Sequence, residues 1–186
     1  MTENSIDRFI ESAKRVGAEV LRIENLPEAA AYIAGKAQGT TLVPETPLAV
    51  RHGLRALLTA AGVDVFGKSF REAGYVPGAG VTFSNFAMAD TGTVVLESTD
   101  ENIRLATTLP EKHFILVDPA TILSDNLAAA APMTAFHRDP APKFIAYITG
   151  PSRTADIERV LAIGCHGPRE LHILLVDGIS SDLMEN

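Results

Sequence analysis

The chain has 186 residues, of which 46% are hydrophobic and 21% charged, and its formal net charge at pH 7 is −7. Such a composition is typical of a soluble globular protein, and the length predicts a single domain over residues 1–186. The acidic pI, near 5.2, argues against nucleic-acid binding, because proteins that bind a phosphate backbone usually carry a basic face. No apolar run approaches the ~20 residues of a membrane span, and the polar N-terminus lacks a signal-peptide pattern, so we expect a cytoplasmic location. The one cysteine leaves no internal disulfide and no cysteine-ligated cluster within the chain.

The first 65 residues alternate between helical periods and short apolar runs. Helices are predicted from Ser5 to about Val16, from Asn25 to Ala37 and from Thr46 to Gly62. Short strands are predicted over 18–23, 40–43 and 63–65. This alternation predicts an α/β fold, with a mostly parallel, Rossmann-like sheet between two other layers.

The stretch from Phe66 to Ser84 interrupts this alternation, because glycine and proline recur through it, and it is expected to be a loop. The string Gly78-Ala79-Gly80 has neither a third glycine nor a preceding strand, which argues against a dinucleotide-binding loop. Beyond it, the sequence predicts a strand or a short helix from Phe86, a turn at Asp90-Thr91-Gly92 and a strand over Thr93–Leu96. The next expected elements are a buried strand over 113–118, a helix over 119–130 and a loop over 131–142.

Two apolar runs near the end, 144–149 and 171–176, flank a segment with a helical period. Short apolar runs on either side of such a segment are typical of two parallel strands joined by a crossover helix. Gly150 to Thr154 would then form the start of that helix, where unpaired N–H groups and the dipole favour a bound anion. Ser152, Arg153 and Thr154 add two hydroxyls and a guanidinium. The alternative is that they cap the helix, with Arg153 in a surface ion pair with Asp156 or Glu158.

Two strings in this chain resemble a known family. GPSRTADIE over 150–158, followed by GCHGP over 164–168, resembles the C-terminal signature of the lactate-utilisation (LUD-domain, LutC/YkgG) family. ADTGTVVL over 89–96 resembles its other hallmark, and the similarity extends over about 87–176. The resemblance implies the fold shared by glucosamine-phosphate deaminase, ribose-phosphate isomerase and CoA transferases (NagB/RpiA/CoA transferase-like), in which ligands gather at the carboxyl ends of the strands.

The two hallmark strings supply the candidate ligand-binding residues: Asp90, Thr91, Gly92, Thr93, Gly150, Ser152, Arg153, Thr154, Asp156 and His166. Asp90-Thr91-Gly92 also spells the aspartic-protease triplet, but such an enzyme needs two facing aspartates and an all-β context. The structural alternative is a turn in which Asp90 and Thr91 bond their own backbone and Gly92 supplies a positive φ. We expect Asp90–Thr93 and Ser152–Thr154 to share one cleft, which requires the strand at Thr93 to run antiparallel to 144–149.

His166 also has a purely structural alternative, because a histidine between glycines and prolines is often only a turn residue. A regular crossover helix would place it about 15 Å from Ser152, at the opposite edge of the sheet. One site would then contain both only if the helix is short or a second subunit contributes. The adjacent Cys165 is expected to serve packing.

The resemblance implies a component of a cytoplasmic system that oxidises L-lactate to pyruvate, acting with two partner proteins, one of them an iron–sulfur protein. In that reading the chain binds a small anionic ligand or assists the partner, and it carries no metal or cofactor of its own. The alternative is a stand-alone transferase, isomerase or hydrolase acting on a small phosphorylated or carboxylate substrate, which rests on fold analogy alone. The sequence leaves open the catalytic residues, the ligand and whether the chain forms a homo-oligomer.

Overall fold

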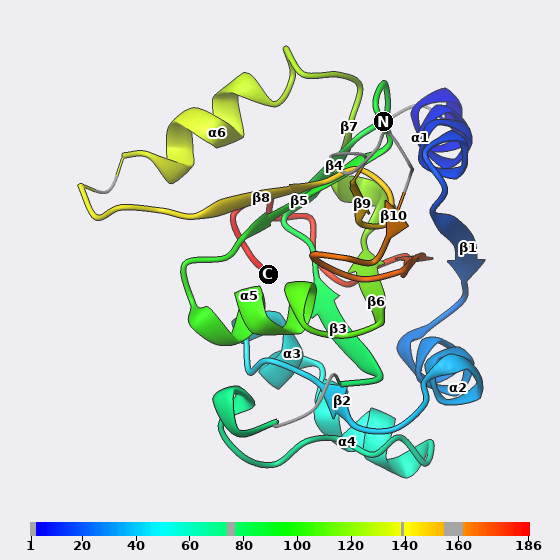
Figure 1. Cartoon of the computed structure of the whole chain (residues 1–186). Coiled ribbons are helices and arrows are strands. Elements are labelled where there is room, and N and C mark those ends of the chain that lie inside the picture. Colours follow the sequence, from blue (N-terminus) through cyan, green and yellow to red (C-terminus); the bar gives the residue numbers. More distant parts are fainter. Residues whose placement is uncertain (1–2, 74–76, 139, 155–161) are drawn as a thin grey trace.

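The computed structural model describes residues 3–73, 77–138, 140–154 and 162–186. Its centre is a sheet in which every strand pairs in parallel with its neighbours, in the order β1-β11-β6-β3-β2 (Figure 1). The strands are β1 (Glu19–Ile23), β11 (Glu170–Val176), β6 (Lys112–Val117), β3 (Ala79–Phe83) and β2 (Thr41–Leu42). The predicted α/β class with a mostly parallel sheet is therefore confirmed.

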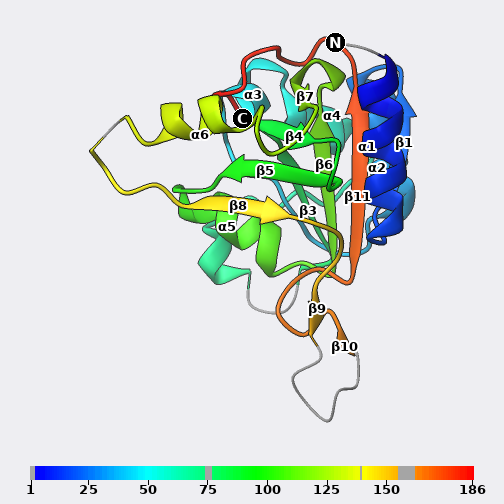
Figure 2. The ribbon, with the colours of Figure 1, turned by 90° about the horizontal axis from the view of Figure 1, so that it is seen from above.

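A second sheet, in the order β7-β4-β5-β8, lies on one face of the central sheet (Figure 2). It consists of β7 (Ile122–Leu123), β4 (Phe86–Met88), β5 (Thr93–Glu97) and β8 (Ile145–Ile148). β5 pairs antiparallel with both β4 and β8, whereas β4 and β7 are parallel. This sheet occupies the layer in which a doubly wound fold would have only helices.

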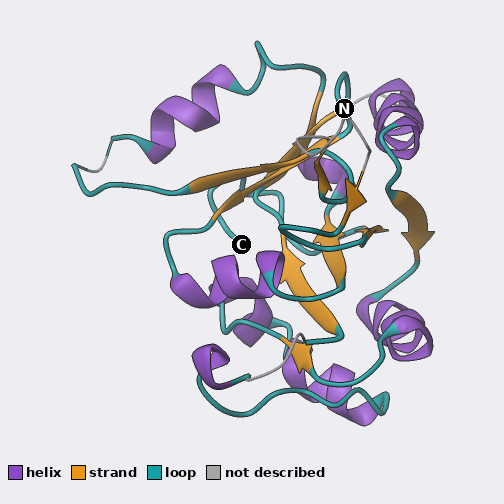
Figure 3. Cartoon of the chain, viewed as in Figure 1, coloured by secondary structure: helices purple, strands orange, loops and turns teal. Residues whose placement is uncertain are grey.

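Helices cover the remaining surfaces of the two sheets (Figure 3). The other face of the central sheet is covered by α2 (Leu26–Lys36), α3 (Pro47–Arg51) and α4 (Leu54–Ala60). α1 (Glu3–Arg15) packs beside the second sheet, α5 (Glu101–Thr108) lies against β3, and α6 (Ala130–Phe136) covers the outer face of the second sheet. Two 3-10 turns, Phe70–Glu72 and Pro119–Thr121, complete the helical elements of the described residues. None of the helices among the described residues is long and apolar enough to cross a membrane.

The unbroken apolar run of β6 follows from its position between two hydrophobic layers. Phe114 and Leu116 face the helices, whereas Ile115 and Val117 face the second sheet. Because side chains alternate along a strand, a strand buried on both faces needs apolar residues at every position. β11 has the same pattern from Ile173 to Val176, so these two strands form the middle of the core.

The N-terminal half follows the predicted order, with three corrections. The strand predicted over 63–65 is reduced to a single parallel bridge between Val65 and Thr41. The helix predicted over 46–62 is divided into α3 and α4, because Gly53 adopts a left-handed conformation with φ 59°. The segment assigned to a loop contains β3, a central strand that is buried throughout. A Cβ at Gly80 would overlap the backbone of Ala106, so this glycine permits α5 to approach the strand closely. Glycine here marks a close contact and not a loop.

Two further predictions are wrong. Residues 119–130 form a 3-10 turn and β7 before any α-helix, and α6 lies where a loop was expected. The two apolar runs that were expected to form one βαβ unit lie in different sheets, since β8 belongs to the second sheet and β11 to the central one. Between them, β9 (Arg153–Thr154) pairs antiparallel with β10 (Ala162–Ile163). Arg153 and Thr154 therefore do not start a helix, and the predicted helical residues from Asp156 to Leu161 lie outside the described part of the chain.

Candidate functional site

The first hallmark turn rests against the last turns of α1. The Ser12 hydroxyl donates to the Asp90 carbonyl oxygen at 3.3 Å. Gly92 has φ 67°, and a Cβ on it would overlap the backbone of Ala13. Only glycine combines that backbone conformation with so close an approach. The turn is thus held to α1 through its main chain.

The second hallmark reaches the same end of α1. The Arg153 guanidinium donates to the Val16 carbonyl oxygen at 2.6 Å, which satisfies a group that the helix end leaves without a helical partner. Gly150, with φ 81°, also approaches Val16 so closely that a Cβ would meet its carbonyl oxygen. Arg153 therefore has a structural contact that the sequence did not suggest, and it lines neither of the two cavities described below.

A row of hydroxyls joins the two hallmarks. Thr93 Oγ1 lies 2.8 Å from both Thr91 Oγ1 and Thr149 Oγ1. β5 runs antiparallel to β8, the direction required by the expectation of one cleft, so the start of β5 and the end of β8 coincide. The last turn of α1 lies against both motifs. Asp90 Oδ1 is buried there and has no hydrogen-bond partner among the described residues.

The β9–β10 hairpin brings the GCHGP loop back beside Ser152. The Ser152 N–H donates to the Pro168 carbonyl at 2.9 Å, and Gly164 N–H donates to the Ser152 carbonyl at 3.0 Å. His166 therefore lies near Ser152 and not at the opposite edge of a sheet. The expected separation assumed a regular helix, whereas a hairpin returns the chain to its starting point.

Two neighbouring cavities open beside this hairpin. The first, which we call the hairpin cavity, has a volume of about 490 Å³ and is lined by the end of α5, the loop into β6 and the GCHGP loop: Thr108, Leu109, Pro110, Glu111, Ile163, Gly164, Cys165, His166, Gly167 and Arg169. Arg169 packs its side chain over Gly164, where a Cβ would overlap it. Arg169 and His166 thus bring a guanidinium and an imidazole to one cavity, with the Glu111 carboxyl also in its wall.

The second cavity, which we call the β8 groove, has a volume of about 290 Å³ and shares His166 and Gly167 with the first. One wall is an unbroken run, residues 146–152, and the others come from Thr107, Thr108, His113, Leu171 and the loop over 166–168. His113 is only 1% exposed, and its Nε2 lies 2.9 Å from Thr82 Oγ1. Burial lowers the pKa of His113 from 6.5 to about 3, so this ring is neutral at physiological pH.

Both cavities lie at the amino edge of the central sheet, where β6 and β11 begin. The sequence placed Ser152 and Arg153 at the carboxyl edge, because β8 was taken for a strand of that sheet. The true carboxyl edge has a different cavity, of about 670 Å³, whose wall includes Asp118, Asp177, Asp182 and Glu185. Its one described cation, Arg51, is already held by Glu185 at 2.7 Å.

The structure divides the predicted site residues into three groups. Gly150, Ser152 and His166 line the cavities, whereas Asp90, Thr91, Gly92, Thr93 and Arg153 gather at the end of α1. Thr154 pairs with Ala162 in the hairpin, and Asp156 lies outside the described residues. Sequence reasoning missed His113 and Arg169, which lie on and beside strands that were treated only as core. Within the described segments, no group of three histidine, cysteine or acidic side chains is placed to hold a metal ion.

Comparison with known proteins shows which family the chain resembles. A family model described as "LUD domain" matches residues 6–176. "Lactate utilization protein C" of Geobacillus thermodenitrificans is 33% identical over 156 residues, covering 77% of this chain and 65% of that protein, and the Bacillus subtilis protein of the same name is 31% identical over 150 residues, covering 74% and 62%. The chain thus spans less than two thirds of these relatives. A crystal structure of a DUF162 family protein from Deinococcus radiodurans shares the fold, with a TM-score of 0.67 and 21% identity over 93% of this chain and 96% of that one.

Proposed function

The chain belongs to the LUD-domain family, and from this premise we propose that it serves lactate utilisation as a subunit that binds a small organic carboxylate. The names of the relatives support the pathway. Oxidation of L-lactate to pyruvate releases two electrons and two protons, so a complete system includes an electron acceptor. We assign that acceptor to an iron–sulfur partner, as the family resemblance implies.

The proposal of a bound carboxylate depends on one observation, the presence of Arg169 and His166 in the wall of the hairpin cavity. A guanidinium offers paired N–H donors that match the two oxygens of a carboxylate. An imidazole beside it can donate to the same group or to a neighbouring hydroxyl or carbonyl oxygen. The volume, about 490 Å³, falls in the range of small-molecule sites, roughly 300–1,000 Å³.

The two hallmark strings would then serve this site indirectly. Ser152 holds the GCHGP loop through backbone hydrogen bonds to Gly164 and Pro168. Gly92, Gly150 and Arg153 fix the ends of β5 and β8 against α1. In this account the hallmarks position His166, which alone among the predicted residues lines the hairpin cavity.

Replacing Arg169 with glutamine should weaken the binding of L-lactate or pyruvate at least about tenfold, a loss of about 1.4 kcal/mol, because the guanidinium partner of the carboxylate is removed. Isothermal titration calorimetry measures the affinity. Arg153→Gln is the matched control, since that guanidinium contacts Val16. We expect this control to lower stability by about 1 kcal/mol and to cost much less affinity than Arg169→Gln, because Arg153 acts on the site only through its contact with Val16.

Two results would contradict the proposal. If Arg153→Gln abolished binding and Arg169→Gln did not, the ligand would lie against α1 and not in the hairpin cavity. If the isolated chain oxidised L-lactate with an artificial acceptor, it would be an enzyme in its own right and not a binding subunit.

A further inference from the structure

β8 is an edge strand whose outer side has no partner strand in the described structure. Ser98 N–H donates to the Phe144 carbonyl oxygen at 2.7 Å, so the backbone of Phe144 faces β5. Successive residues of an antiparallel strand turn their N–H and C=O groups to opposite sides. Ala146 and Ile148 therefore face β5 as well, while the backbone groups of Ile145 and Tyr147 point to the open side.

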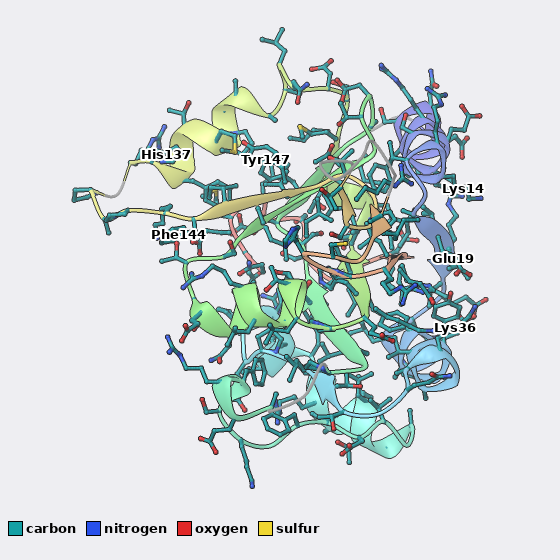
Figure 4. All side chains as sticks on the ribbon, in the orientation of Figure 1. Lys14, Glu19, Lys36, His137, Phe144 and Tyr147 are labelled. Carbon is teal, nitrogen blue, oxygen red and sulfur yellow. The ribbon has the colours of Figure 1, made fainter. Side chains whose placement is uncertain are left out.

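The open side of β8 borders the β8 groove. Its wall includes every residue from Ala146 to Ser152 in succession, and the end of α5 forms the opposite side (Figure 1). Two large apolar side chains also lie exposed along this segment, Tyr147 on β8, which is 52% exposed, and Phe144 just before it, which is 57% exposed (Figure 4). An unpaired backbone edge thus lies next to a depression of about 290 Å³, large enough for one side chain.

The edge strand β1 of the central sheet is protected against the pairing of another strand in a way that β8 is not. β1 carries Glu19 and Arg22 among its five residues, and charges of this kind discourage the pairing of another strand. The four residues of β8, Ile145–Ile148, carry no charge. An uncharged edge beside a groove is the arrangement that domains use to receive an extended peptide as an added strand.

The charge distribution indicates which kind of peptide fits. Residues 130–169 contain five basic and three acidic residues, a net charge of +2, whereas the rest of the chain has a net charge of −9. Lys143 lies two residues before β8, and Arg104 lies over the Phe144 ring at 4.9 Å. At the other end of the groove are His166 and, in the adjoining cavity, Arg169. Acidic side chains also lie near the two ends, among them Glu97, opposite Ile145 on β5, and Glu111 in the hairpin cavity.

We propose that the open edge of β8 binds an extended, acidic segment of a partner protein as an added strand, with one apolar side chain of that segment in the β8 groove. A second copy of this chain fits less well, because two β8 edges would bring together two regions of like charge. The backbone contacts of the added strand lie outside the carboxylate site, since Tyr147 is not part of the hairpin cavity, although the β8 groove and that cavity share His166.

The test uses two blocked hexapeptides, one alternating glutamate with valine and one alternating lysine with valine. NMR titration of the full chain should show the Glu–Val peptide binding at least about tenfold more tightly than the Lys–Val peptide. The amides of Ile145 and Tyr147 should become protected from hydrogen exchange, because their N–H groups face the added strand. This readout needs no variant.

Tyr147→Pro removes an N–H that β5 does not use, so the strand should tolerate it, and it should weaken binding at least about tenfold. Tyr147→Val keeps the N–H and should lose much less affinity than Tyr147→Pro, because it changes only one side chain of the groove wall. The proposal would be overturned if the proline variant bound the Glu–Val peptide as tightly as the wild type, or if that peptide did not bind at millimolar concentration. It would also be overturned if the protection of the Tyr147 amide rose with protein concentration alone. The last result would identify a homodimer edge instead.

Discussion

Replacing Gly92 with alanine should lower the free energy of unfolding by about 2–5 kcal/mol, which is enough to unfold many domains of ordinary stability. Two costs add. The residue has φ 67°, where a Cβ is strained, and the new Cβ would overlap the backbone of Ala13 in α1. Relief requires the turn to move away from the helix, which also breaks the contact between Ser12 and Asp90.

Gly39 is the matched control, because it has the same φ of 67° and no atom within 4 Å of the place that a Cβ would occupy. Gly39→Ala should therefore cost only the backbone strain, about 1–2 kcal/mol. Urea unfolding of the wild type and both variants gives the comparison. Equal losses in the two variants would show that the hallmark turn is not held against α1.

Acid should destabilise the protein through His113. Burial lowers its pKa from 6.5 to about 3, so between these values the unfolded chain binds a proton that the native state does not. The free energy of unfolding therefore rises with pH across that window. The stabilisation is complete above pH 6.5 and is lost as the pH falls toward 3, with a total on the order of 5 kcal/mol.

His113→Gln tests this directly, since glutamine can still hydrogen-bond Thr82 but does not titrate. The variant should lose less stability than the wild type between pH 6.5 and 4, as measured by urea unfolding at each pH. Some dependence of the variant's stability on pH will remain, because burial also lowers the pKa of His172, although Glu170 and Glu19 oppose this effect. Parallel stability curves for variant and wild type would show that the pKa of His113 is not lowered in the native state.

Periodicity and capping residues predicted the N-terminal elements because those signals are local. Asn25 accepts a hydrogen bond from Glu28 N–H, and Thr46 from Ala49 N–H, as caps do. β3 was missed because its glycines were interpreted without their neighbour, and Gly80 is explained only by the approach of α5. The two sheets could not be separated from the sequence either, since a buried apolar run looks the same in both.

The sequence predicted which segment of the chain contributes to the candidate site, but not which residues line it. The GCHGP loop does line a cavity, yet Arg153, the cation that the sequence favoured, bonds to α1. Arg169 could not be recognised, because its approach to His166 depends on the hairpin and on the start of β6. A contact that crosses from one sheet to the other leaves no periodic signal in either segment.

The most direct test of the account is the structure of crystals soaked in L-lactate. We predict ordered lactate in the hairpin cavity at the amino edge of the central sheet, with its carboxylate against Arg169 and His166. Lactate bound at the carboxyl edge, in the cavity that contains Arg51 and Asp118, would contradict the account.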